Sequence, residues 1–144
     1  MRALQLSFLM IVLCALAPAA DETVEQLKPR VDGATAADRA QICLRIAQLQ
    51  LKSADHLFDE GKPEQALTAV EEIAAYAEKA RDAAKESNKH LKNVEIGARK
   101  MAEKLKDIKR TLALEDQAPV EKVIQRLEDV RTALLQEMFK KEKK

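Results

Sequence analysis

The residues in this sequence that are best suited to chemistry are two histidines, His56 and His90, and one cysteine, Cys43. A histidine that binds a metal or acts as a base normally has a second ligand or partner within one helical turn. His56 has Glu60 four residues later, which is a weak pair, and the residue at the same distance from His90 is Val94. The two histidines also fall at opposite ends of a predicted helical hairpin. We therefore expect both to be solvated on helix surfaces, without a shared metal site.

No motif for catalysis or cofactor binding is present in the sequence. There is no Cys-x-x-Cys-His for covalent haem, and the 3 glycines are too few for a phosphate-binding loop. Neighbouring carboxylates such as Glu71 and Glu72 occupy adjacent helix positions and so point in different directions. The sequence thus predicts no catalytic, cofactor-binding or metal-ligating residues, and a protein that is not an enzyme.

Residues 1–19 have the pattern of a secretory signal peptide. Arg2 supplies a positive charge, residues 4–16 are apolar, and small residues precede a cleavage site after Ala19, with Ala20 as the alternative site. An uncleaved membrane anchor is disfavoured, because the apolar run is about 13 residues and a spanning helix needs roughly 20. We expect the protein to be exported by this segment and to be periplasmic or extracellular.

Removal of this leader leaves Cys43 as the single cysteine, so the mature chain cannot form an internal disulfide. The thiol could pair with a second chain or act as a nucleophile. The neighbouring apolar positions Ala40 and Ala47 share its helix face, which favours a small buried hydrophobic residue instead.

Composition indicates one helical domain, residues 20–144, of coiled-coil character. Charged residues make up 34% of the 144 residues, Gly numbers only 3 and Pro only 4, and Trp is absent. The leader holds one base and no acid, so the remaining chain carries equal numbers of basic and acidic residues. A net charge of zero argues against nucleic acid as a partner.

Residues 63–114 carry an unbroken heptad pattern of apolar residues. The first row is Val70, Ala77, Ala84, Leu91, Ala98, Leu105 and Leu112, and the second is Ile73, Ala80, Ser87, Val94, Met101 and Ile108. This pattern predicts one long central helix. The alternative is a break near 86–93, where helix propensity is weakest, which would give a four- or five-helix bundle.

Shorter helices are predicted on both sides of the long one in an all-α fold. Residues 36–60 and 118–140 have helical apolar stripes, and each is expected to pack antiparallel on one half of the long helix. A short N-terminal helix, shortened or kinked by Pro29, precedes them, and a basic tail, 140–144, follows.

The turn between the first two long helices resembles a tetratricopeptide-type hairpin over residues 50–73. Its matching positions are Ala54, Leu57, Gly61, Ala66 and Val70. The resemblance implies a helix–turn–helix unit around Gly61. Gln50, Ser53 and Glu78 stand where the family has its aromatic, leucine and proline, and no second repeat follows, so no peptide-binding groove is carried over.

One charge pattern marks a possible interaction surface. Lys85, Lys92, Arg99 and Lys106 are spaced by seven and would form a basic row on the long helix. Such a row could meet an acidic protein partner in the envelope, an anionic lipid or an anionic polymer, or simply pair with acids on a neighbouring helix. A homodimer along the long helix is a further expectation, because paired helices would leave wide apolar faces uncovered.

Two functional hypotheses follow from these features. The first is a non-enzymatic, exported helical module of the cell envelope that acts as an interaction, adaptor or chaperone-like protein. The second is a sensor or carrier of a small apolar ligand or a metal inside a helical bundle.

Overall fold

The structure, a computed structural model, describes residues 21–143, so the predicted signal peptide and its cleavage sites lie outside the described residues. The elements are α1 (Val24–Leu27), the short 3-10 helix η1 (Lys28–Arg30), α2 (Ala36–Asp59), α3 (Pro63–Ser87), α4 (Leu91–Thr111) and α5 (Leu114–Glu142). Residues 21–143 contain no strand, which confirms the all-α class. No helix in this range combines the length and apolar character that crossing a membrane requires.

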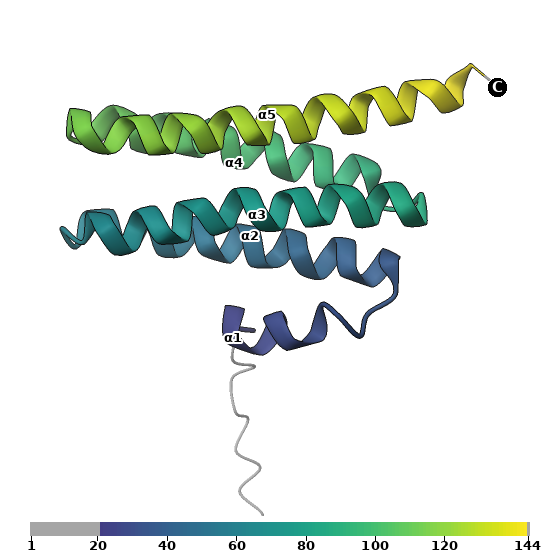
Figure 1. Cartoon of the computed structure of the whole chain (residues 1–144), viewed down its shortest axis with the longest axis horizontal. Coiled ribbons are helices and arrows are strands. Elements are labelled where there is room, and N and C mark those ends of the chain that lie inside the picture. The colour runs from purple at the N-terminus through teal and green to yellow at the C-terminus, as the bar shows by residue number, and fades with distance from the viewer. Residues whose placement is uncertain (1–20, 144) are drawn as a thin grey trace, which may run out of the picture.

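The four long helices form a bundle of two antiparallel hairpins (Figure 1). α2 and α3 make the first hairpin, α4 and α5 make the second, and the two hairpins pack on each other. α1 and η1 lie against the outer side of the first hairpin, away from α4 and α5. The short N-terminal helix is therefore confirmed, and Pro29 marks its change to a 3-10 turn.

The first hairpin begins and turns where the sequence predicts. Oγ1 of Thr35 caps α2 by accepting the Asp38 N–H at 3.2 Å. Gly61 supplies the left-handed turn with φ 73°, and Pro63 is the first residue of α3. The buried face of α3 is built mostly from alanine: Ala66, Ala69, Ala74, Ala77, Ala80, Ala83 and Ala84. These short side chains allow α2 to pack closely on α3.

The predicted continuous helix over 63–114 is wrong, and the alternative of a break near 86–93 is confirmed. α3 ends at Ser87, and α4 begins at Leu91 and runs back along the bundle. Between them, Asn88 and His90 have left-handed backbones, with φ of 57° and 64°. Asn accepts this conformation more readily than most residues and ends α3 in the usual way.

The two heptad rows of apolar residues, which together form the heptad seam, keep their phase across this break. They do so because the connection fits between two seam positions. Ser87 is the last seam residue of α3 and Leu91 is the first of α4, so residues 88–90 displace no apolar residue. Periodicity alone therefore cannot distinguish the loop from a continuous helix. Folding back lets α4 contact α2 and α3 of its own chain in addition to α5, whereas an extended helix would keep only the contact with α5.

The second hairpin supplies most of the large core side chains. The fully buried ones are Val94, Leu105, Val120, Val123, Ile124, Leu127, Val130 and Leu134. α5 begins at Leu114 rather than at the predicted residue 118, because the residues before Pro119 form an extra turn in which Gln117 donates to the carbonyl of Leu112 at 3.0 Å. The register against α4 is marked by Lys106–Glu128 at 3.2 Å and Lys109–Glu121 at 2.5 Å.

Gly97 marks a close approach of the two hairpins on the α2–α4 side. A Cβ added to it would lie only 2.6 Å from a δ carbon of Leu44 on α2. A glycine inside a helix lowers its intrinsic stability. Here it allows the side chain of Leu44 to pack directly on the backbone of α4.

Arg126 of α5 joins the hairpins on the opposite side, through two carboxylates of α3. Its guanidinium donates to both oxygens of Glu78, at 2.7 and 2.9 Å, and also to Glu71. These hydrogen bonds lower the pKa of Glu78, against the opposing effect of partial burial. A second arginine, Arg131, binds the buried carboxylate of Glu95 at 3.0 Å. The ionic contacts therefore fix how α5 sits against α3 and α4.

We expect Leu127→Ala to lower the free energy of unfolding by about 2–5 kcal/mol, because it opens a cavity in the fully buried core. Leu114→Ala on the same helix is the matched control. The Leu114 side chain is 83% exposed, so its change should stay within about 0.5 kcal/mol. Urea unfolding monitored by circular dichroism measures both, and equal losses would contradict the assignment of the core.

We expect Arg126→Gln to destabilise the protein by about 1–2 kcal/mol at pH 7. Glu78 has a lowered pKa in the folded state, so its contribution is present above its unfolded pKa of about 4.3 and is lost as the pH falls through the folded value. The difference between wild type and variant should therefore shrink at pH 3. Lys122→Gln, at an exposed cation on the same helix, is the control, and a pH-independent difference would contradict this role of Arg126.

Candidate interaction surface

The structure does not assemble the predicted basic row of four residues. Lys92, Arg99 and Lys106 lie on α4, but Lys85 lies on α3, which runs in the opposite direction. Nζ of Lys106 is held by Glu128 of α5 at 3.2 Å, so this cation already has an acidic partner. Lys92 and Arg99 remain exposed on α4.

α2 lies beside α4 and adds two cations that the sequence analysis missed. Lys104 pairs with Asp55 of α2 at 3.0 Å, near one end of the contact between the two helices. Arg45 and Lys52 lie on the exposed side of α2, next to this contact. They are seven residues apart, as are Lys92 and Arg99. This shared spacing is the feature of the sequence that could indicate one common surface. It does so only in combination with the packing of α2 beside α4, which the sequence does not reveal.

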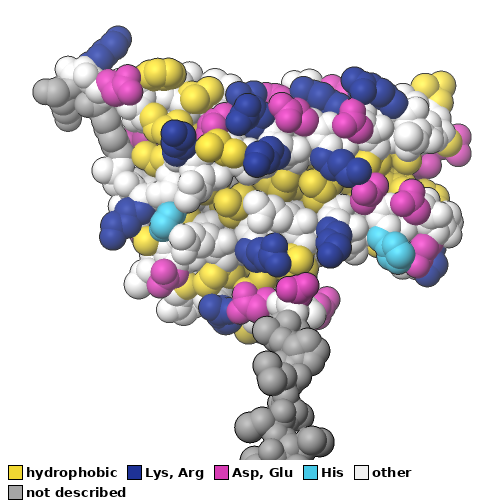
Figure 2. Space-filling view, turned by 180° about the vertical axis from the view of Figure 1, so that it is seen from behind, with side chains coloured by type: hydrophobic (Ala, Val, Ile, Leu, Met, Phe, Trp, Pro, Cys, Tyr) yellow, Lys and Arg dark blue, Asp and Glu magenta, His cyan; other side chains and the backbone are white. Residues whose placement is uncertain are grey.

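Together these cations form a surface that we call the basic face: Arg45 and Lys52 of α2, and Lys92, Arg99 and Lys100 of α4. All five are exposed, and none has an ion pair within the described part of the chain. Figure 2 shows Lys and Arg side chains over both helices on this side of the molecule, with hydrophobic side chains between them. The half-buried Leu44, Leu51 and Ile96 belong to these two helices.

The charge of this face is not cancelled by its own carboxylates. Two acids of this region, Asp55 and Asp107, are already bound by Lys104 at 3.0 Å and Arg110 at 2.9 Å. Glu103 is the exposed carboxylate that lies among the cations of α4. The basic face therefore keeps a positive excess, in contrast to the α3–α5 side, where Arg126 is bound by two glutamates.

The other chemically capable residues are used locally. His56 of α2 contacts Glu60, the residue that follows this helix, at 2.9 Å, while Nδ1 of His90 lies 3.3 Å from the side-chain amide of Gln41. Cys43 is fully buried, as the sequence predicts, and burial raises the pKa of its thiol. In residues 21–143 no three His, Cys, Asp or Glu side chains are grouped so that they could hold a metal ion.

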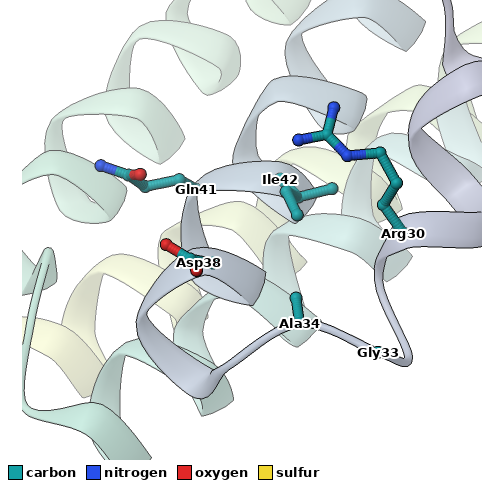
Figure 3. A pocket seen from close by; sticks show the side chains of 6 residues that line it. All are labelled: Arg30, Gly33, Ala34, Asp38, Gln41 and Ile42. Carbon is teal, nitrogen blue, oxygen red and sulfur yellow. The ribbon is translucent and has the colours of Figure 1, made fainter.

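An open hollow lies where the chain passes from η1 to α2 (Figure 3). Arg30 stands on one side, Asp38 on the other, and Ile42 lies between them, while Gln41 points away. Two of its polar side chains are engaged elsewhere, since Arg30 binds Glu22 at 2.7 Å and Gln41 contacts His90. A ligand site normally has polar groups that converge, which these do not.

We expect the thiol of Cys43 to react at least about 100-fold more slowly with a thiol reagent in the native protein than in urea, because it is buried and its pKa is raised. An added thiol at an exposed position of the same helix, made by Ser53→Cys, is the control and should react at once. Fast native labelling at Cys43 would contradict its purely structural role.

Comparison with known proteins does not assign this surface to a family. The chain matches no protein-family model, and no curated protein or solved structure with which it was compared matches it. Its function is therefore inferred from the geometry and charge of the basic face.

Proposed function

We propose that this chain is a non-enzymatic, exported helical module of the cell envelope that binds an acidic protein partner through the basic face. The observation that carries this proposal is the set of exposed cations on α2 and α4 that have no ion pair within the described residues. The signal-peptide pattern of residues 1–19 supports export. An adaptor role agrees with a surface that offers charge and shape but no catalytic group.

The arrangement of the face favours a helical partner segment over a diffuse polyanion. On each helix two cations stand seven residues apart, Arg45 and Lys52 on α2 and Lys92 and Arg99 on α4, which is two helical turns. Half-buried apolar side chains lie on the same two helices. An amphipathic helix with an apolar stripe and acidic flanks would match both features. The chain carries nearly equal numbers of bases and acids, so any attraction is confined to this face.

The test compares two double charge reversals that change net charge equally. Lys92→Glu/Arg99→Glu alters the basic face, while Lys122→Glu/Lys140→Glu alters exposed cations elsewhere on α5. Each variant is cross-linked in intact cells, and the captured proteins are quantified by mass spectrometry. We expect the first variant to lose its main partner at least about tenfold and the second to retain it, because only the first places acids against acids.

Three results bear on the proposal in different ways. Equal capture by the wild type and both variants would exclude the basic face as the binding site. If Lys92→Glu/Arg99→Glu leaves protein capture unchanged but abolishes binding to anionic vesicles or to an anionic polymer, the basic face binds that lipid or polymer instead. Recovery of binding when Arg45 and Lys52 are reversed together with acids of the captured partner would identify the contact directly.

A further inference from the structure

Residues 88–90 connect the two hairpins of the bundle covalently, and we call them the hinge. The backbone conformation of the hinge is unfavourable. Asn88 and His90 are the only residues other than glycine with a positive φ in the described chain. Left-handed conformations are less favourable than right-handed helical ones for side chains with a Cβ, including asparagine and histidine, which adopt them more often than most residues. The strain is therefore concentrated where the chain reverses.

The start of α4 adds to this weakness. Its N-cap, His90, makes no side-chain capping hydrogen bond, and the first turn contains no acidic residue. The exposed N–H groups of the first turn thus lack the side-chain acceptors that usually satisfy them. In a continuous helix these N–H groups would bond to the last carbonyls of α3.

The sequence would support such a helix without exposing any apolar residue. The heptad seam passes from Ala84 to Leu91 and from Ser87 to Val94 without a change of phase. In a continuous helix residues 88–90 fall between seam positions, and all three are polar. Straightening the connection therefore removes strain and loses only the contacts between hairpins.

We propose that two copies of this chain exchange their α4–α5 hairpins, with α3 and α4 joined into one continuous helix in each copy. Each α5 then packs on α3 of the second copy, and the contacts between hairpins form again between the chains. These include Arg126 with Glu78 and Leu44 with Gly97. Short, strained hinge loops are the usual sites of such exchange. This inference does not depend on the proposed function of the basic face.

The first test changes the backbone preference of the hinge. Asn88→Ala/His90→Ala disfavours the left-handed conformations and favours helix, so we expect its dimer dissociation constant to fall at least about tenfold. Asn88→Gly/His90→Gly removes the strain and should favour the monomer. Lys89→Ala, at the hinge position without positive φ, is the matched control. Analytical ultracentrifugation of the full chain, at about 0.15 M salt or above to screen the hinge lysines, measures all four proteins.

The second test distinguishes exchange from side-by-side association. Arg126→Glu and Glu78→Lys each break the contact between hairpins within one chain. When the two variants are unfolded and refolded together, an exchanged dimer pairs the introduced glutamate of one copy with the introduced lysine of the other, and it restores the native pair at the second site. We expect a heterodimer that is more stable than either variant alone, whereas closed chains associated side by side gain nothing.

A single chain carrying both Arg126→Glu and Glu78→Lys shows whether the reversed pair is tolerated, and it should recover most of the lost stability. If it does and the mixture forms no heterodimer, exchange is excluded. Equal dimer dissociation constants for the alanine and glycine variants of residues 88 and 90 would also overturn the proposal. The backbone preference of this connection would then not govern association.

Discussion

The reversal of the chain at Asn88–His90 brings the two hairpins of one chain into contact. A two-helix layer buries only one face of each helix, so neither hairpin could complete a core by itself. The reversal places the α4–α5 layer, with its leucines and valines, over the alanine-rich α2–α3 layer. Close packing within the first hairpin and large side chains from the second together fill the bundle.

Charged side chains take different roles on the two sides of this bundle. On the α3–α5 side, Arg126 finds Glu78 and Glu71 within reach, and the pairing fixes the relation between the hairpins. On the α2–α4 side the close approach at Gly97 brings two exposed helices together, and each presents cations outward. The same residue types therefore hold the fold on one side and are exposed, without an ion pair among the described residues, on the other.

The helices could be predicted from their apolar periodicity. The turns between them could be predicted only where the cap and turn preferences of the residues are strong. Thr35, Gly61 and Pro63 carry cap and turn preferences that no competing pattern opposes, so the first hairpin was placed correctly. At residues 88–90 a weak loop preference competes with a strong heptad pattern, and that pattern fits a loop as well as a continuous helix. The same break divides the predicted basic row, because Lys85 lies on α3 and the other three residues lie on α4. The sequence does not predict that Arg45 and Lys52 lie near this row, because no sequence rule places α2 beside α4.

An unbroken seam across a loop is itself informative about the energy of the fold. In a sequence optimised for one structure, the local preferences of the residues normally agree with the overall fold, and the loop residues exclude the competing structure. Here Asn88 favours the end of a helix, but His90 makes no side-chain cap for α4 and has a left-handed backbone that costs more for it than for glycine. A glycine at residue 90 would resolve the conflict in favour of the closed bundle, and an interrupted seam would do the same. The chain has neither, so the closed and extended arrangements of α3 and α4 differ mainly in whether one chain or two supply the same core.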